Sequence, residues 1–175
     1  MKMLRFAMVL CLAAGCGGAQ ASNTPSSAAP PASTPSINKP SSPGVSLHLR
    51  RADGEPLFLE KMRGKPSLVF IFTTFDASSQ FGLNALIEFA KSHPTLQIIA
   101  IAVQPNPGRI LPAFADALHA SFPLTYDPSD SVLTGKSDLG ALDAVPCYIL
   151  LNEKGRMVER HYGVLETDAL RDFVY

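Results

Sequence analysis

Two continuous apolar runs, separated by one amphipathic segment, constrain the fold of this chain more than any other feature. The runs are SLVFIFT at residues 67–73 and LQIIAIAV at residues 96–103. Both are short and rich in β-branched or aromatic residues, which is typical of strands buried on both faces of a sheet. Strands joined through a helix pair in parallel by a right-handed crossover. The chain is therefore predicted to fold around an α/β sheet.

The residues between the two runs have the start, the apolar face and the end of a helix. Asp76 and Ser78 are suitable N-caps, because their side chains can accept hydrogen bonds from first-turn N–H groups. The apolar positions that follow have the i, i+3, i+4, i+7 spacing of a buried helical face: Leu83, Leu86, Ile87 and Ala90. His93-Pro94 ends the segment. We therefore expect strand, helix and strand in succession.

Two hairpins are predicted at the ends of this unit. Apolar residues alternate over residues 45–49, and the Asp53-Gly54 turn leads from there into a short apolar run at residues 57–59. Near the other end, CYILL at residues 147–151 and the segment 156–162 flank the turn NEKG. Strands joined by such short turns must be antiparallel, so the predicted sheet is mixed.

The remaining segments predict peripheral elements of the same domain. A helix of about ten residues should end near Ala120, with Pro112 tolerated near its first turn. A short strand is expected at Leu124 to Tyr126, and Thr167 should cap a final helix. Residues 45–175 are thus predicted to form one α/β domain, a central mixed sheet with helices on both faces.

Composition and charge exclude some classes of partner. Hydrophobic residues make up 46% of the chain and charged residues 17%, as in ordinary globular proteins. Lys plus Arg and Asp plus Glu both number 15, so no net field attracts nucleic acid, and no nucleic-acid partner is expected. The histidines are scattered without ligand spacing, so neither a metal site nor a cofactor is expected: His48, His93, His119 and His161.

The amino terminus has the layout of an export signal. Lys2 and Arg5 precede an apolar run from Phe6 to Ala14, and small residues follow. The run is about half the length that a membrane-spanning helix needs. We therefore expect residues 1–15 to be a signal peptide.

The end of that signal, LAAGC at residues 12–16, resembles the lipobox of bacterial lipoproteins. The resemblance implies that Cys16 becomes a lipidated amino terminus and that the protein is anchored to a membrane of the bacterial cell envelope, on the periplasmic face. Ala19-Gln20-Ala21 also fits the small-x-small pattern of ordinary secretory cleavage, so a secreted soluble protein cleaved after Ala21 is the alternative. The anchor is preferred because acyl chains explain why a cysteine stands there.

A tether is predicted between the anchor and the domain, over residues 16–44. From residue 17 onward this segment contains six Pro, seven Ser and a single charged residue, Lys39. Such a composition buries too little apolar surface to offset the entropy of ordering. The segment is expected to be disordered, either as a spacer or without a spacing role.

The whole span from Val45 to Tyr175 resembles the thioredoxin fold, and more narrowly the TlpA and redoxin-like branch of envelope thiol-disulfide oxidoreductases. The resemblance is carried by the opening strand pair, the strand SLVFIFT with its helix, the strand and helix that follow, and DAVPCYILLNEKGRMVERHYG at residues 143–163. That last segment resembles the family's stretch in which a cis-proline, here Pro146, precedes a strand, a turn and a strand. The resemblance implies a three-layer thioredoxin-like fold.

The cysteine pair of that family is absent. Catalytic members carry Trp-Cys-x-x-Cys at a helix N-terminus, where the helix dipole and free N–H groups stabilise a thiolate. The resemblance aligns Phe75 with the aromatic residue, Asp76 with the first cysteine and Ser79 with the second. Cys11 is lost with the signal and Cys16 is lipidated or lost, so a mature monomer cannot form an intramolecular disulfide.

Cys147 is the one thiol that remains, and two interpretations stay open. It follows Pro146 where the family usually has Thr, so it could form mixed disulfides with a client or a small thiol. Alternatively it is a small buried residue at a strand start, as free cysteines usually are. The second interpretation is preferred because nothing in the sequence marks a basic neighbour or a helix terminus beside it.

The resemblance implies a binding groove between the turn after the first buried strand and the segment around Pro146. Its predicted residues are Phe75, Asp76, Ser79, Val145, Pro146 and Cys147. The preferred function is a non-catalytic module that binds a peptide or an envelope protein. The alternatives are a thiol-disulfide oxidoreductase or peroxide-reactive protein that acts through Cys147 alone, and an architectural subunit that uses another face.

Overall fold

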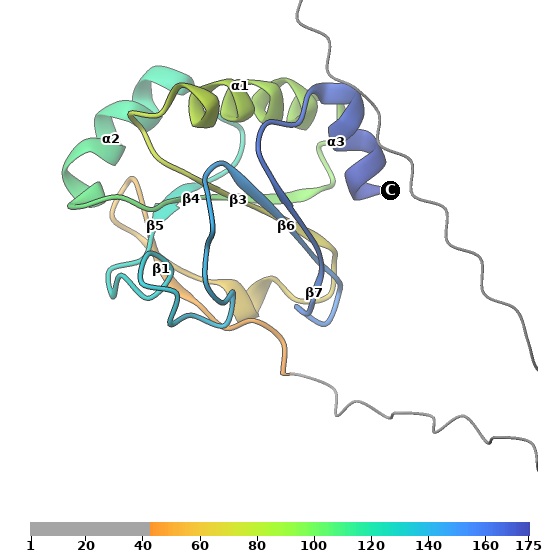
Figure 1. The fold of residues 1–175 in the computed structure, drawn as a ribbon, viewed down its shortest axis with the longest axis horizontal. Helices are drawn as coiled ribbons and strands as arrows, with labels where there is room; N and C mark the ends of the chain where they lie inside the picture. Colours follow the sequence, from red (N-terminus) through yellow and green to blue (C-terminus); the bar gives the residue numbers. More distant parts are fainter. Residues whose placement is uncertain (1–42) are drawn as a thin grey trace, which may run out of the picture. The chain divides into compact units, whose positions relative to one another are not determined.

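The computed structural model describes residues 43–175. The predicted signal peptide, Cys16 and nearly all of the tether lie outside the described residues. Within them, seven strands form one sheet in the order β2-β1-β5-β4-β3-β6-β7 (Figure 1). None of the helices in this part of the chain is long and apolar enough to cross a membrane.

The elements follow one another closely along the chain. The strands are β1 His48–Arg51, β2 Pro56–Phe58, β3 Ser67–Phe72, β4 Gln97–Ala102, β5 Leu124–Tyr126, β6 Cys147–Leu151 and β7 Met157–Tyr162. The helices are the 3-10 helix η1 Leu59–Met62 and the α-helices α1 Ala77–Ser92, α2 Pro107–Leu118 and α3 Thr167–Val174.

The predicted parallel unit forms the centre of the sheet. All six residues of β3 are buried, and β3 pairs in parallel with β4 over its whole length. On its other side β3 pairs antiparallel with β6, which brings Cys147 opposite Ile71. Both predicted hairpins are confirmed, because β1 pairs antiparallel with β2 and β6 with β7. The sheet is therefore mixed, as expected.

Alternate residues of the central strands enter two separate cores. Phe70, Phe72 and Tyr148 pack against the three α-helices, which all lie on one side of the sheet (Figure 1). Ile71 and Cys147 point to the other side. That side is covered by the N-terminal segment, by η1 and by the loop between β5 and β6, which contributes Val132 and Leu139. Helices were predicted on both faces of the sheet. On this second side the short η1 is the helix present, and residues 127–146 form turns instead of an α-helix.

Two helix starts differ from the predictions by a few residues. Glu166, not Thr167, is the N-cap of α3, and Thr167 is the first helical residue. The helix α2 begins at Pro107, so Pro112 is its sixth residue instead of lying in its first turn. A proline is favoured at the first helical position because its missing N–H has no partner there, and Pro107 therefore sets the start.

Candidate functional site

The turn between β3 and α1 is held by the side chain of Asp76. Its Oδ2 accepts hydrogen bonds from the backbone N–H of Ser79 at 2.7 Å and from the hydroxyl of Ser78 at 2.6 Å. Asp76 is thus the N-cap of α1, as the sequence predicted. These hydrogen bonds, that of Ser78 first, lower the pKa of Asp76 below its ordinary value. The resemblance aligns this carboxylate with the first cysteine of the catalytic family, and here its hydrogen bonds hold the start of α1.

Ser79, which the resemblance aligns with the family's second cysteine, is also part of this turn. It is fully buried, and its Oγ accepts a hydrogen bond from the Thr73 N–H at 3.3 Å. The adjacent Asp76 carboxylate, whose pKa is lowered, is a weak general base, so this buried hydroxyl is not an activated nucleophile. Asp76 and Ser79 therefore both have structural roles in this turn.

Two glutamines complete the turn, and the sequence analysis did not identify either of them. The Oε1 of Gln104 accepts from the Thr74 N–H at 2.7 Å and from the Thr74 hydroxyl at 2.9 Å. Gln80 donates from Nε2 to the Thr74 carbonyl at 2.8 Å. Gln104 follows β4 as Thr74 follows β3, and the carboxyl ends of parallel strands meet at one edge of a sheet. This rule could have predicted from the sequence that Gln104 lies near Thr74.

Phe75 is the one residue of this turn that projects from it. Its side chain is 72% exposed, although it directly precedes the N-cap. A hydrophobic residue at that position often packs against the first turn of the helix. Its partner position here is Gln80, whose side chain bonds Thr74 instead. Phe75 therefore leaves a large apolar side chain in solvent without a packing role.

The segment around Pro146 lies at the same end of the sheet as this turn. The peptide bond between Val145 and Pro146 is cis, Val145 is half-buried and Pro146 is buried. Because Cys147 pairs with Ile71, the residues before β6 are next to those after β3. The structure thus brings Val145 and Pro146 into the neighbourhood of the turn.

Cys147 is in the core and not on a surface. Its exposure is 0%, and it lies in the core on the side of the sheet opposite α1. Burial raises the pKa of this thiol to about 11, an effect that Arg160 partly opposes and Asp143 reinforces. A thiol that stays protonated and buried is a poor nucleophile. The geometry therefore matches the interpretation of Cys147 as a packing residue.

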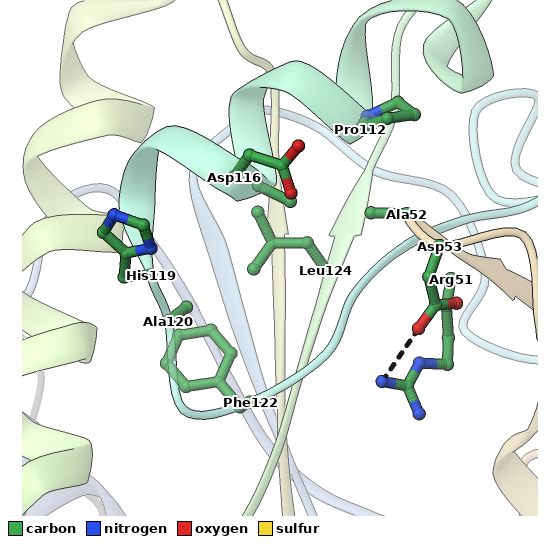
Figure 2. A pocket seen from close by; sticks show the side chains of 10 residues that line it. Arg51, Ala52, Asp53, Pro112, Asp116, His119, Ala120, Phe122 and Leu124 are labelled. Carbon is green, nitrogen blue, oxygen red and sulfur yellow. Dashed lines mark ion pairs between the residues drawn. The ribbon is translucent and has the colours of Figure 1, made fainter.

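A hollow of about 480 Å³ lies elsewhere on the domain, between α2 and the turn after β1 (Figure 2). Its floor includes Phe122 and Leu124, and the ion pair of Arg51 with Asp53, at 3.1 Å, stands on one wall. No residue of the turn between β3 and α1 lines it. Within residues 43–175, no three His, Cys, Asp or Glu side chains are grouped so as to hold a metal ion.

Solved structures share this architecture. StoA from Bacillus subtilis is 18% identical with a TM-score of 0.62, and the match covers 77% of this chain and 98% of that one. The fold of the described residues is therefore thioredoxin-like. The pneumococcal exposed lipoprotein thioredoxin Etrx1 from Streptococcus pneumoniae is 19% identical with a TM-score of 0.61, over 73% of this chain and 96% of that one.

A third thioredoxin-like structure is similar to the same degree. It is a thiol:disulfide interchange protein of the thioredoxin family from Chlorobium tepidum, 17% identical with a TM-score of 0.62, over 75% of this chain and 92% of that one. No protein-family model matches the sequence, and no curated protein does. Identities this low establish the fold of the thioredoxin-like domain and leave its activity to be argued from its own residues.

Proposed function

We propose that this protein is a lipid-anchored component of the bacterial cell envelope whose thioredoxin-like domain binds an extended peptide or a partner protein without catalysing thiol exchange. The observation that carries the proposal is the exposure of Phe75, whose side chain is 72% exposed. This residue lies in the turn where catalytic proteins of this fold carry their two cysteines. Exposed aromatic residues are favoured in binding surfaces, since they bury much area for little loss of side-chain entropy. Val145 and Pro146 lie nearby and would form the other side of the groove.

The local chemistry of the turn supports binding over catalysis. Asp76 and Ser79 replace both sulfurs, and each is held by hydrogen bonds that stabilise the turn. The rival proposal, an oxidoreductase acting through Cys147, requires an accessible thiolate, whereas Cys147 is fully buried. Insulin reduction by dithiothreitol separates the two: the protein and its Cys147→Ser variant should both give the background rate, and a faster rate that the variant loses would establish the enzyme.

Photo-crosslinking tests the groove in the intact protein. A benzophenone amino acid is placed at position 75 in one variant and at position 81 in another. Phe81 is a matched control because it is 70% exposed on α1 but lies outside the proposed groove. We expect a discrete crosslinked envelope protein or peptide from position 75 only. Equal crosslinking at both positions, or from position 81 alone, would favour the architectural subunit that uses another face.

The anchor is proposed from the LAAGC segment and is tested separately. Etrx1, one of the similar structures, is described as an exposed lipoprotein thioredoxin, which is compatible with an anchored role for this chain. Mass spectrometry of the mature amino terminus should find a diacylated Cys16, and Cys16→Ser should release the protein from membranes. An unmodified terminus at Ser22 would instead establish the secreted form.

A further inference from the structure

Five basic side chains come from two loops at one end of the thioredoxin-like domain. Lys61, Arg63 and Lys65 lie in and after η1, and Lys154 and Arg156 lie in the turn between β6 and β7. All are exposed except Arg156, which is half-buried. We call these five residues the basic patch.

Hydrogen bonds show that the two loops are adjacent. The Gly64 N–H donates to the Glu153 carbonyl at 2.8 Å, which joins one loop directly to the other. The side chain of Arg63 also reaches the second loop. It lies against Gly155, so closely that a Cβ added to this glycine would be 3.0 Å from the Nε of Arg63. Arg63 and Lys65 therefore share one surface with Lys154 and Arg156, whereas the Lys61 ammonium lies 4.5 Å from the centre of the Phe58 ring.

The beginning of the described chain lies within the same surface. The Val45 N–H donates to the Gly155 carbonyl at 2.7 Å, and the Arg63 guanidinium donates to the Gly44 carbonyl at 3.1 Å. The segment that comes from Cys16 thus joins the domain at the basic patch. In Figure 1 this start and the turn between β6 and β7 both lie at the lower end of the domain.

Two acidic residues accompany the five basic ones, so the basic patch keeps a net positive charge. Glu60 pairs with His48 at 3.1 Å, and its side chain is only 27% exposed. Glu153 is exposed in the turn between β6 and β7, beside Lys154. Among the described residues, no basic side chain of the patch forms an ion pair. The surface is therefore positive although the whole chain is neutral.

We propose that the basic patch docks on the anionic phospholipid surface to which the protein is anchored. This inference rests on the proposed anchor at Cys16. A charged surface acts over about 10 Å at ordinary ionic strength. The chain from Cys16 enters the domain at Gly44 and Val45, beside Arg63, so the basic patch is the part of the domain nearest to the anchor along the chain. Each basic residue close to an anionic bilayer strengthens binding about fivefold.

Docking in this way would point the proposed groove away from the membrane. The strand β3 starts beside Lys65 and ends at Phe72, just before the turn that carries Phe75. Six residues of strand span about 20 Å. The strand β6 runs the opposite way, from Pro146 at the groove to the turn that carries Lys154. The patch and the groove are therefore at opposite ends of the sheet, and a docked domain presents Phe75 to the aqueous side.

Vesicle sedimentation tests the docking without the acyl chains. The probe is the mature chain from residue 16 with Cys16→Ser, mixed with phosphatidylcholine vesicles with or without phosphatidylglycerol. We expect binding only to the phosphatidylglycerol vesicles at about 0.05 M salt, and its loss at about 0.5 M salt, where the charges are screened. The variant Lys61→Gln, Lys65→Gln, Lys154→Gln should bind on the order of 100-fold more weakly.

A matched variant controls for net charge. Lys91→Gln, Arg109→Gln, Lys136→Gln removes the same charge from exposed positions outside the patch and should bind like the parent. Equal loss in both variants, or no dependence on phosphatidylglycerol, would overturn the proposal. Because the probe carries no lipid, these outcomes are independent of whether Cys16 is acylated, which the amino-terminal mass spectrum decides.

Discussion

Adjacent threonines at the end of β3 have opposite hydrogen-bonding environments. The Thr74 hydroxyl donates to Gln104 at 2.9 Å. The Thr73 hydroxyl is buried and has no partner among the described residues. A buried polar group without a hydrogen bond costs free energy, whereas one that is bonded contributes modestly.

Valine, which has nearly the shape of threonine, should therefore change stability in opposite directions at these two positions. We expect Thr73→Val to raise the free energy of unfolding by about 1 kcal/mol and Thr74→Val to lower it by about 1 kcal/mol. Urea denaturation of both variants measures the difference. A loss of stability in Thr73→Val would mean that its hydroxyl has a partner, such as a bound water.

The Asp76 cap should make stability depend on pH. Hydrogen bonds from Ser78 and Ser79 lower the pKa of Asp76 in the folded protein. Its carboxylate therefore stabilises the fold above the ordinary carboxyl pKa of about 4, and this contribution is lost as the pH falls through the lowered folded pKa. The variant Asp76→Asn should melt at a lower temperature than the parent at pH 7, and the gap should close in acid. A gap that stays constant with pH would contradict the assignment.

At the scale of elements, α1 approaches the sheet closely because it has a glycine in its middle. A Cβ added to Gly82 would lie 2.6 Å from the Tyr148 hydroxyl and 3.2 Å from the Phe70 ring. Tyr148 is fully buried, and burial raises its pKa to about 12. Glycine is unfavourable in a helix interior, so close packing is the reason for it here.

Gly82→Ala should consequently destabilise the protein although alanine favours helices. Overpacking of this kind costs about 1–3 kcal/mol. The double variant Gly82→Ala, Tyr148→Phe should recover part of the loss, because it removes the nearest oxygen. Thermal unfolding of the two single variants and the double variant gives the coupling free energy. Additive effects would show that the two side chains do not interact.

The loop that covers the second core is organised by Asp127. Its carboxylate accepts hydrogen bonds from Ser129, from the Ser131 hydroxyl at 2.6 Å and from the Val132 N–H at 2.9 Å. Burial alone would raise the pKa of Asp127, but these hydrogen bonds lower it on balance. The loop thereby buries Val132 without an α-helix.

Asp127→Ala should release this loop from the sheet. We expect a loss of about 2–4 kcal/mol, because the buried Val132 N–H and three partly buried donors lose a charged acceptor at once. Hydrogen exchange should show faster exchange of the Val132 amide, with α1 little affected. Faster exchange spread evenly over the domain would mean that the loop and the sheet unfold as one unit.

At the scale of the whole molecule, β6 places Cys147, the one cysteine of residues 43–175, in the core on the side away from α1. With its pKa raised to about 11 and no exposed surface, Cys147 should react with iodoacetamide at least about 100-fold more slowly than a free cysteine. The mature chain with Cys16→Ser contains this thiol alone, so mass spectrometry before and after denaturation measures it directly. Rapid alkylation of the native protein would instead favour an oxidoreductase that acts through Cys147.

The order of strands and helices could be predicted from the sequence because it depends on local patterns. The buried runs of β3 and β4, the spacing of α1 and the Asp76 cap are each contained within a short segment. The sequence also shows directly that Asp76 and Ser79 stand at the two positions that the resemblance aligns with the family's cysteines.

Only the tertiary structure decided what depends on residues far apart in the chain. Gln104 reaches Thr74 because parallel pairing brings the ends of β3 and β4 together. The burial of Cys147 depends on which side of the sheet β6 presents, and a one-residue shift in register would reverse it. The basic patch likewise exists because pairing of β3 with β6 brings the residues before one beside those after the other. Local patterns determine the elements, whereas the register between strands determines which side chains meet.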